Sequence, residues 1–249
     1  MSAEELLPII EQRLQSTFRE ISGTDNQGGD YSDVQDLWNY MFNKSPKKRK
    51  KGKASSSSVT NNSTNGWYEK AFDYWENPEN CPVSDDGVLG GFGHLTPVDV
   101  RESNLFLDEL QRRYPFLKYE DVADCGAGIG RVTKNLLLPR CTSSVALIEQ
   151  SPRLLQSAAQ YLGPVEGKRV AYIQQGLQEF APAENTYDLI WIQWVIGHLN
   201  DIDFVQFFQR CIRGLKPNGV IVLKDNAIID PSTAYCIDLD DNSVARNLK

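Results

Sequence analysis

From Gly66 onward the sequence alternates between strand-like and helix-like segments, and this alternation most limits what the chain can fold into. A typical helical segment is SPRLLQSAAQYLG (residues 151–163), which starts with a Ser-Pro pair and ends at glycine. A strand–helix–strand series buries both faces of its strands when they form a parallel sheet covered by helices. The predicted fold class is therefore α/β, a doubly wound parallel sheet with helices on both faces.

Five strands and three main helices are expected in this region. The strands are predicted at residues 119–125, 143–150, 169–175, 187–195 and 220–226. The helices are predicted at residues 131–139, where Pro139 should stop the helix, at 151–163, and within 200–219. The run YDLIWIQWV is almost continuously apolar, so this strand should be buried on both faces.

The first 65 residues differ in composition and divide into two parts. Residues 1–45 contain apolar residues at helical spacing and are expected to form an accessory helical segment. Residues 46–65 read as a linker, basic at first and then rich in Ser, Asn and Thr. Its six cations resemble a nuclear import signal read by an import receptor, or else a solvated charge run: Lys47, Lys48, Arg49, Lys50, Lys51 and Lys53. The first reading predicts a protein of the nucleus as well as the cytoplasm.

Charge and composition exclude several kinds of protein. The net charge of −7 becomes −13 when the six linker cations are left out, which fits poorly with a nucleic-acid-binding face. It fits better with a cationic substrate, or simply with solubility. No apolar run is long enough to cross a membrane, and the early acidic residues Glu4 and Glu5 do not suit a signal peptide. The five cysteines are scattered without metal-ligand spacing, so no metal site is expected.

A glycine-rich turn, DCGAGIGR (residues 124–131), follows the first predicted strand and opens a helix. Glycine lets the backbone turn sharply and approach a ligand closely, and a helix amino terminus offers unpaired N–H groups. Glu149 ends the second predicted strand, where a carboxylate can accept hydrogen bonds from ribose hydroxyls. This pair suits either NAD or S-adenosylmethionine.

The spacing of the glycines favours S-adenosylmethionine. Gly126, Gly128 and Gly130 follow a GxGxG pattern, not the GxGxxG of dinucleotide-binding proteins. Asp124 precedes them, and a cationic sulfonium is attracted to nearby carboxylates, whereas a pyrophosphate is repelled.

Several motifs together resemble the protein alpha-N-terminal methyltransferases. They are DCGAGIGR, GLQEF, WIQWVIGHLND, LKPNGVIVLKDN and DGVLGGFGH, and the resemblance runs from about Trp67 to the end. It implies a Rossmann-like class I methyltransferase domain at residues 66–249 and S-adenosylmethionine as cofactor. It further implies methylation of the free α-amine of proteins that begin X-Pro-Lys or X-Pro-Arg.

The resemblance also implies roles for individual residues. Cofactor-binding positions would be Gly126, Gly128, Arg131, Glu149, Leu177, Gln178 and Gln193. Arg131 would reach the methionine carboxylate, Leu177 and Gln178 would hold the adenine, and Glu149 stands where the family usually has Asp. Substrate-binding positions would be Trp75, Leu89, Trp194, Asp238 and Ser243, the last two meeting the substrate's Lys or Arg.

The same resemblance implies the catalytic residues. His198 and Asp241 match the proposed general bases, and Asn226 matches the residue that anchors the amine end of the substrate. An α-amine has a pKa of about 8 and is nucleophilic only when neutral, so a nearby base can take its proton during direct methyl transfer. No covalent enzyme intermediate is needed.

Family members continue beyond the region that ends here at Lys249, so the resemblance implies that a carboxyl-terminal antiparallel strand pair is missing. Three alternatives remain beside an N-terminal methyltransferase. They are a small-molecule methyltransferase on the same fold, a truncated form that binds cofactor or protein N-termini without turnover, and, more distantly, an NAD dehydrogenase.

Overall fold

The computed structural model describes residues 22–33, 37–38, 41, 65–229 and 233–247. The chain forms two compact units. The first, here the hairpin unit, consists of Met1–Ala71 and Asn226–Lys249, and the second, here the α/β unit, is Phe72–Asp225. Helix α3 (Asn65–Glu76) runs through the boundary at Ala71. The divisions thus fall at Ala71 and Asp225, whereas the sequence suggested one boundary near residue 66.

The α/β unit contains a five-stranded sheet in which every pair of neighbouring strands is parallel. In spatial order the strands are β5 (Arg169–Gln174), β4 (Ser144–Glu149), β3 (Asp121–Cys125), β6 (Tyr187–Gln193) and β7 (Leu215–Lys224). The predicted parallel sheet is therefore confirmed, and β6 is buried along its whole length as expected. The antiparallel pair that the resemblance adds to such a sheet is not among its strands in the described residues.

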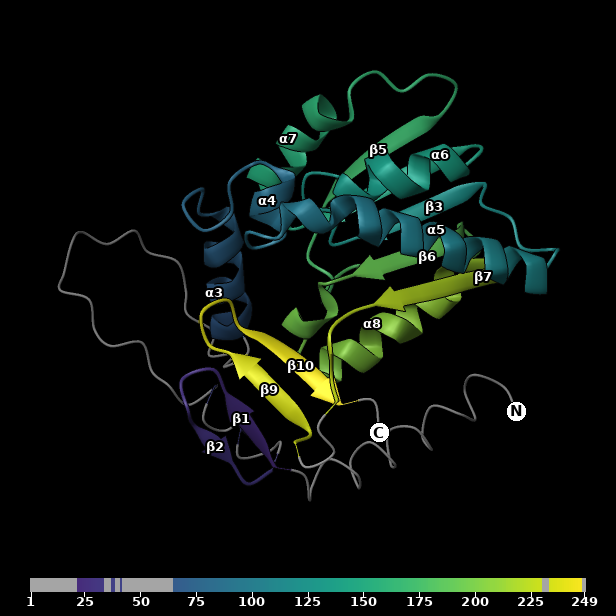
Figure 1. Cartoon of the computed structure of the whole chain (residues 1–249). Coiled ribbons are helices and arrows are strands. Elements are labelled where there is room, and N and C mark those ends of the chain that lie inside the picture. Colours follow the sequence, from purple (N-terminus) through teal and green to yellow (C-terminus); the bar gives the residue numbers. More distant parts are fainter. Residues whose placement is uncertain (1–21, 34–36, 39–40, 42–64, 230–232, 248–249) are drawn as a thin grey trace, which may run out of the picture. The chain divides into compact units, whose positions relative to one another are not determined.

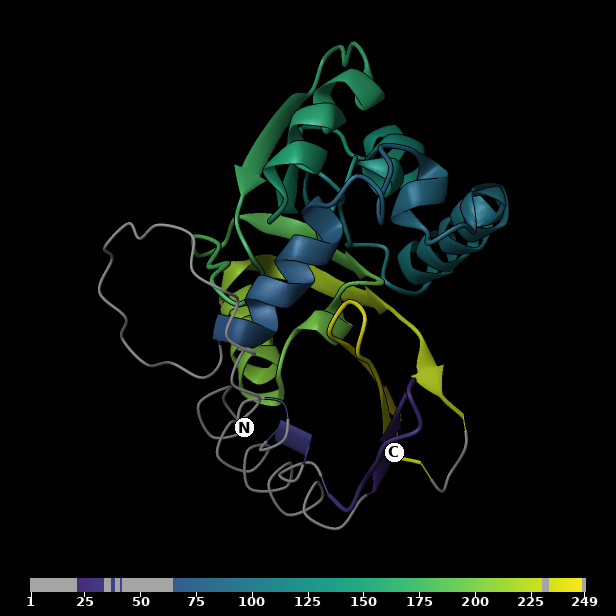
Figure 2. The ribbon, with the colours of Figure 1, turned by 90° about the vertical axis from the view of Figure 1, so that its left-hand side faces the viewer.

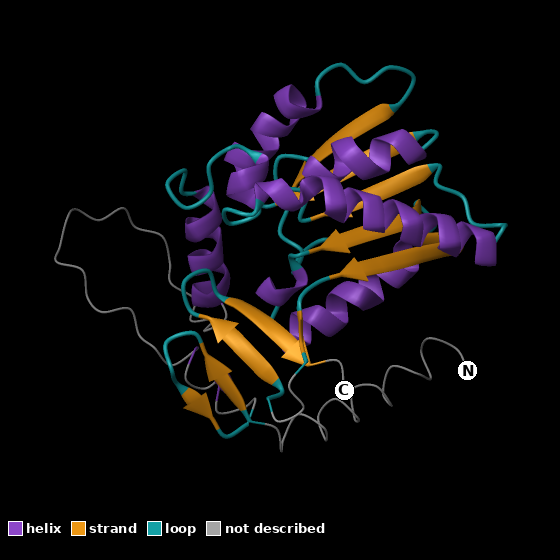
Figure 3. Ribbon diagram, viewed as in Figure 1, coloured by secondary structure: helices purple, strands orange, loops and turns teal. Residues whose placement is uncertain are grey.

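Helices cover both faces of this sheet (Figures 1 and 3). On one face lie α5 (Thr96–Arg113), a π-turn (Thr133–Leu137) that continues into α6 (Leu138–Arg140), and α7 (Pro152–Leu162). On the other face lies α8 (Asp201–Gly214). Two shorter helices precede α5, namely α4 (Asp85–Val88) and the 3-10 turn η2 (Gly93–Leu95). No helix in the described ranges has the length and apolar character of a membrane span.

The caps of α7 follow the sequence prediction. Ser151 accepts a hydrogen bond from the Leu154 N–H, Pro152 occupies the first turn, and Gly163 ends the helix at φ 70°. A serine N-cap satisfies an otherwise unpaired donor and is worth about 1 kcal/mol. Because α7 starts directly after β4, this cap also fixes the chain where β4 ends.

Three local predictions were incomplete or wrong. The helix predicted at residues 131–139 is found at residues 131–140 and ends one residue after Pro139, but its π-turn (Thr133–Leu137) was not predicted. The segment LKPNG is not simply an exit turn, since β7 begins at Leu215 and accommodates Asn218 (φ 69°) at an irregular register. Helix α5 was not predicted, because its buried stripe includes Asp99 and Ser103 and therefore lacks apolar periodicity.

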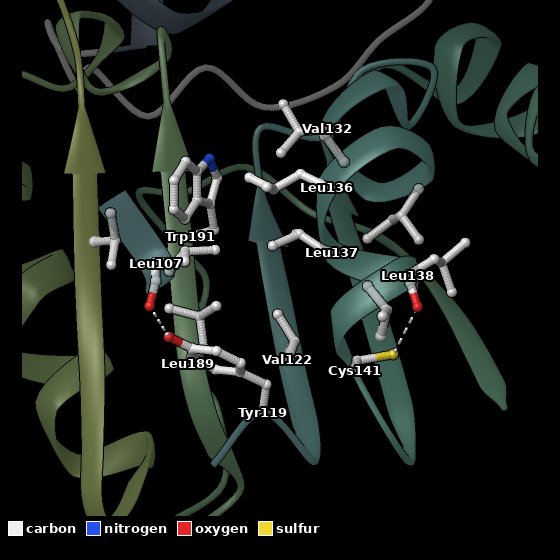
Figure 4. Close-up of a cluster of buried hydrophobic side chains, with 14 of the residues drawn as sticks. Leu107, Tyr119, Val122, Val132, Leu136, Leu137, Leu138, Cys141, Leu189 and Trp191 are labelled. Atoms are coloured by element: carbon white, nitrogen blue, oxygen red, sulfur yellow. Dashed lines mark hydrogen bonds between the residues drawn. The ribbon is translucent and has the colours of Figure 1, made fainter. Parts of the chain in front are cut away.

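The core of the α/β unit lies between the sheet and the helices α5, α6 and α7 (Figure 4). Leu107 of α5 and Leu137 pack there with Leu189 and Trp191 of β6. Burying such a large apolar side chain stabilises the fold by about 1.5–3 kcal/mol. Trp191 is 1% exposed, which confirms that it is a core residue. This core holds the strands so that their carboxyl ends form one edge.

The hairpin unit has a sheet of its own, with strand order β2-β1-β9-β10-β8. Strands β9 (Tyr235–Asp238) and β10 (Ser243–Asn247) form an antiparallel hairpin. The purple β1 (Gly23–Asp25) runs beside the yellow β9 in Figure 2, with β2 (Asp30–Tyr31) and β8 (Ala227–Ile228) at the two edges. Ile237, Val244, Trp38 and Trp67 pack in its core.

The accessory segment expected to be helical is described only in part. Residues 1–21, which include the first predicted helix, and the linker at residues 46–64 lie outside the described residues. Leu37 and Trp38 of the second predicted helix are helical and buried. Residues 23–31, before Leu37, form the two strands β1 and β2, which the sequence did not suggest.

Candidate active site

The glycine turn lies directly after β3 and bends back toward β4. Gly126, Gly128 and Gly130 all have positive φ angles, of 74°, 55° and 82°. A Cβ atom on Gly126 would lie 2.5 Å from the Val195 side chain, so this position has room for glycine alone. The N–H groups of Gly126 and Ala127 donate to the Ile148 carbonyl at 2.9 and 3.0 Å, which anchors the turn to β4. The turn therefore forms the close-approach cradle that a nucleoside cofactor requires.

Glu149 ends β4 next to this turn, as predicted. Its Oε2 accepts a hydrogen bond from the Gly128 N–H at 2.9 Å, and its Oε1 accepts one from the Ser151 N–H at 2.8 Å. Burial raises the pKa of this carboxyl, and the backbone N–H groups of Ser151 and Gly128 oppose that rise. Each carboxylate oxygen has a second lone pair. Glu149 can thus hold the glycine turn and still accept from ribose hydroxyls.

Leu177 and Gln178 lie in the turn that follows β5. Leu177 is buried and Gln178 is half-buried. Arg210 of α8 donates to three carbonyls of this turn: Leu177 at 3.0 Å, Gln178 at 2.9 Å and Phe180 at 2.7 Å. Arg210 was missed by sequence reasoning, since a basic residue on an amphipathic helix is usually solvated. It fixes the segment that the family resemblance assigns to the adenine.

Arg131 and Gln193 meet at a residue that the sequence analysis did not single out, Asp99 of α5. Arg131 Nη1 donates to Asp99 Oδ2 at 2.7 Å, and both side chains are 5% exposed. Gln193 Nε2 donates to both Asp99 oxygens at 2.9 Å, and Lys224 Nζ also pairs with this carboxylate. Burial by itself would raise the pKa of Asp99, but the hydrogen bonds from Lys224, Arg131 and Gln193 outweigh burial and lower it.

We call Asp99, Arg131, Gln193 and Lys224 the Asp99 cluster. It gathers α5, the helix start after the glycine turn, and the carboxyl ends of β6 and β7. A signal for Asp99 was present in the sequence, because a charged residue on the buried stripe of a helix needs partners. It was overlooked because α5 itself was not predicted.

Trp194 follows the end of β6 in an unusual conformation. Its φ angle is 54°, a value that bulky residues rarely adopt and that costs about 1–3 kcal/mol. Its N–H donates to the Lys224 carbonyl at 3.0 Å. The cations of Arg131 and Lys224 lie 5.3 and 5.9 Å from its ring centroid. The ring is thus presented at the strand exit, beside the Asp99 cluster.

Trp75 and His198, predicted from separate motifs, are in direct contact. The Trp75 indole N–H donates to His198 Nε2 at 3.1 Å, and the two rings meet edge to face with centroids 5.9 Å apart. Trp75 also packs against Ile129 of the glycine turn, together with Val88. The pair therefore lies close to the cradle formed by that turn.

Leu89 lies in the segment that leads from α4 to α5. It is the C-cap of α4, and Gly90 and Gly91 after it have positive φ angles of 56° and 91°. Neighbouring Val88 is the nearest residue to a Cβ atom built on Gly128, at 3.4 Å. The end of α4, directly before Leu89, thus lies next to the glycine turn.

Asp238, Asp241 and Ser243 come together at the turn end of the β9–β10 hairpin. Asp238 and Ser243 are paired across the two strands, while Ile237 and Val244 form the adjacent pair in the core. Since side chains alternate between the faces of a strand, Asp238 and Ser243 share the opposite face. Asp241 lies in the connecting turn.

The carboxylate of Asp238 has a partner from the amino-terminal segment. Asn26 Nδ2 donates to Asp238 Oδ1 at 2.7 Å, and Asn26 Oδ1 accepts from the Leu239 N–H at 3.1 Å. Asn26 lies outside the sequence motifs and was not predicted. Asn226, the predicted amine anchor, is exposed at the start of the second stretch of the hairpin unit. The predicted site residues are thus divided between the hairpin unit and the α/β unit.

Two buried groups of β3 adjoin the site without entering it. Burial raises the pKa of Asp124 to about 6, although the Thr133 hydroxyl donates to its carboxylate. Burial likewise raises the pKa of the Cys125 thiol well above its ordinary value. Cys125 is fully buried, which agrees with its reading as a small strand residue and not a nucleophile.

Comparison with known proteins identifies the family. The model of a family described as AdoMet dependent proline di-methyltransferase matches residues 63–249. The N-terminal Xaa-Pro-Lys N-methyltransferase 1-A of Xenopus laevis is 47% identical over 185 residues, which cover 73% of this chain and 79% of that relative. Alpha N-terminal protein methyltransferase 1 of Dictyostelium discoideum is 38% identical over 228 residues, covering 90% and 77%.

Solved structures agree with this result. A SAM-dependent methyltransferase from Leishmania major superimposes with a TM-score of 0.75 at 32% identity, covering 92% of this chain and 82% of that chain. The predicted class I methyltransferase fold, the enzyme class and S-adenosylmethionine as cofactor are thereby confirmed. The chain belongs to the AdoMet-dependent proline di-methyltransferase family.

Proposed function

We propose that this enzyme methylates the free α-amino group of proteins that begin X-Pro-Lys or X-Pro-Arg. The family match and the names of the relatives support this substrate class. The observation within the molecule that carries the proposal is the Trp75–His198 pair beside the glycine turn. It combines an aromatic surface suited to proline with an imidazole suited to an amine proton.

The hydrogen bond from Trp75 supports His198 as general base. The indole N–H can only donate, so its bond to Nε2 orients the imidazole ring. A neutral imidazole is the form that can accept a proton from an amine. Nε2 has one lone pair, so the bond from Trp75 must open as Nε2 takes the proton of the substrate amine. Asp241 is proposed as a second base and Asn226 as the anchor of the amine.

S-adenosylmethionine, when bound, supplies an electrophilic methyl group. The glycine turn, with Gly126 and Gly128, fits a nucleoside because its conformation excludes side chains. Glu149 would accept from the ribose, Leu177 and Gln178 would border the adenine, and Arg131 with Gln193 would face the methionine end. Everything else in the reaction is orientation of the amine and removal of its proton.

Selection of the substrate's first residues would follow from shape and charge. Proline is rigid and has no N–H, so the aromatic walls Trp75 and Trp194, with Leu89, can select it at low entropic cost. The third residue of the substrate carries a positive charge. Asp238, with Ser243 on the same face of the hairpin, is proposed to meet that charge.

The test is methyl transfer from labelled S-adenosylmethionine to a Ser-Pro-Lys peptide, with an amino-acetylated copy as control. Label in the free peptide alone supports the proposal. Equal labelling of both peptides contradicts an α-amine target and points to lysine methylation. Labelling of neither, under conditions where small amines are methylated, favours a small-molecule methyltransferase. Binding of the free peptide without transfer is the result expected of a non-catalytic form.

We also propose that the basic run at residues 47–53 directs the protein to the nucleus. This run lies outside the described residues, and its support is the density of cations in a Ser- and Asn-rich segment. A fluorescent fusion should concentrate in nuclei, and replacing the six cations by Ala should spread it through the cell. An unchanged distribution contradicts the proposal.

A further inference from the structure

We propose that Asp99 is a positioning residue that holds Arg131 and Gln193 in the orientation needed for the methionine end of the cofactor. The inference rests on the cofactor role proposed for Arg131, and it concerns a residue that no sequence motif pointed to. Asp99 would not touch the reacting atoms. It would act through the two side chains that it binds.

The Asp99 carboxylate is the shared acceptor of three side chains. The Asp99 carboxylate is 5% exposed and accepts hydrogen bonds from Arg131 Nη1 at 2.7 Å and from Gln193 Nε2 at 2.9 Å. Lys224 Nζ pairs with the same carboxylate and donates to the Ser103 hydroxyl at 2.9 Å. Three separate elements are thus tied to one buried group on α5. A buried charge with this many partners defines side-chain orientations closely.

The charges of the Asp99 cluster point to an anionic ligand. Arg131 and Lys224 are two cations and Asp99 is one anion, so the cluster as a whole retains one positive charge. The methionine end of the cofactor has one carboxylate and one ammonium, and the cations of the cluster suit its carboxylate. A guanidinium has several N–H donors, and the single one bound to Asp99 leaves others in the same plane. The cluster can therefore pair with one further carboxylate without leaving a buried charge unbalanced.

Gln193 is oriented from both ends. Its Nε2 donates to Asp99, and its Oε1 accepts from the buried Trp191 indole N–H at 2.9 Å. The amide therefore has a single orientation that satisfies both neighbours. Without Asp99, one of these two constraints would be lost.

Removal of the Asp99 charge should disturb the cations. Arg131 and Lys224 both lie against the Trp194 ring, at 5.3 and 5.9 Å from its centroid. Arg131 is buried and Lys224 is 32% exposed, and without an anion between them the two cations repel each other, so each gains by turning toward water. The Arg131 guanidinium would then leave the position from which it reaches the cofactor carboxylate.

The experiment compares two ligands by calorimetry on the full chain. S-adenosylhomocysteine has the methionine-derived carboxylate, whereas 5′-methylthioadenosine has the same adenosine and lacks that end. The variants are Asp99→Asn, which removes the charge at constant size, and Asp99→Glu, which keeps the charge but moves it. Asp108→Asn is the matched control, because it removes a carboxylate of the same helix that pairs with Arg140 at 2.6 Å and is 63% exposed.

Asp99→Asn should weaken the binding of S-adenosylhomocysteine by about 10- to 100-fold, which is the effect of one misplaced charge-assisted hydrogen bond. The affinity of Asp99→Asn for 5′-methylthioadenosine should stay within about twofold of the wild type. The affinities of Asp108→Asn for both ligands should also stay within about twofold of the wild type. If Asp99 had a merely structural role, Asp99→Asn would weaken the binding of both ligands equally, and that result overturns the inference. So does unchanged or tighter binding of S-adenosylhomocysteine.

Asp99→Glu covers the case in which Asp99→Asn does not fold, since it keeps the net charge of the cluster. It should show the same ligand-selective loss, and an equal loss for both ligands overturns the inference as well. Failure of the proposed function would look different. A wild-type protein that binds S-adenosylhomocysteine but does not methylate the peptide leaves the Asp99 result intact.

Discussion

Replacing Gly126 by Ala tests how the fold builds its cofactor cradle. At φ 74° a residue with a Cβ atom is strained by about 1–2 kcal/mol. The new Cβ would also lie 2.5, 2.6 and 2.7 Å from three atoms of the Val195 side chain. Carbon atoms prefer a separation of about 3.5–4.0 Å, so the turn or Val195 must move by about 1 Å. Overpacking of this kind costs about 1–3 kcal/mol.

The two contributions add to about 2–5 kcal/mol, which is large beside a total stability of about 5–15 kcal/mol. Part of this cost should appear as a displaced glycine turn. We therefore expect Gly126→Ala to lower the free energy of unfolding by that amount in urea. Its affinity for S-adenosylhomocysteine should fall at least about tenfold, because the same turn is proposed to contact the cofactor.

Two variants separate strain from contact. Gly167 has a φ angle of 71° and no atom within 4 Å of a built Cβ, so Gly167→Ala should cost the strain alone, about 1–2 kcal/mol, without loss of affinity. Val195→Ala removes the two methyl groups that meet the new Cβ but keeps the Val195 Cβ at 2.6 Å, so it should restore at most part of the affinity lost by Gly126→Ala. The reasoning is refuted if Gly126→Ala is no worse than Gly167→Ala.

Three further predictions concern single side chains. Burial raises the pKa of Asp124 to about 6, so the contribution of Asp124 to the stability of the wild type is greatest below the unfolded-state pKa of about 4 and is lost as pH rises through 6. Asp124→Asn should thus match the wild type near pH 4 and exceed it by up to about 3 kcal/mol at pH 7; a pH-independent difference in urea unfolding contradicts this. Trp75→Phe removes the N–H that holds His198 and should lower kcat/KM for the Ser-Pro-Lys peptide by about 2- to 10-fold, with no such loss in a His198→Ala background. An equal loss in both backgrounds would show that Trp75 does not act through His198. Asn26→Ala removes the donor to Asp238 and should reduce the preference for Ser-Pro-Lys over Ser-Pro-Gln peptides by about 2- to 10-fold, whereas an unchanged ratio of kcat/KM values means that Asn26 serves the fold alone.

Much of the α/β unit could be predicted from the sequence, because its signals are local. The glycine turn, the acid at the end of β4 and the Ser-Pro start of α7 each depend on a few neighbouring residues. The buried run of β6 marks a central strand without reference to its neighbours. Because the glycine turn follows β3 and Glu149 ends β4, these features place both at the carboxyl edge of a parallel sheet.

The Asp99 cluster could not be predicted, because it depends on contacts between distant segments. Arg131 and Gln193 were expected at the site from the family resemblance, whereas Asp99 and Lys224 were not. The contacts that join all four residues come from four separate elements. The pairing of β1 with β9 was missed for the same reason, since more than 200 residues separate Asn26 from Asp238. Both misses concern polar groups whose partners become apparent only after the chain has folded.

The measurement closest to the central claim is mass spectrometry of a Ser-Pro-Lys peptide after incubation with the enzyme and S-adenosylmethionine. Fragmentation assigns each added methyl group to the amino-terminal residue or to the lysine side chain. We predict that all added methyl groups lie on the terminal α-amine, and that Ser-Ala-Lys, without the proline, remains unmodified. Methyl groups on the lysine side chain, or equal modification of Ser-Ala-Lys, would contradict the account.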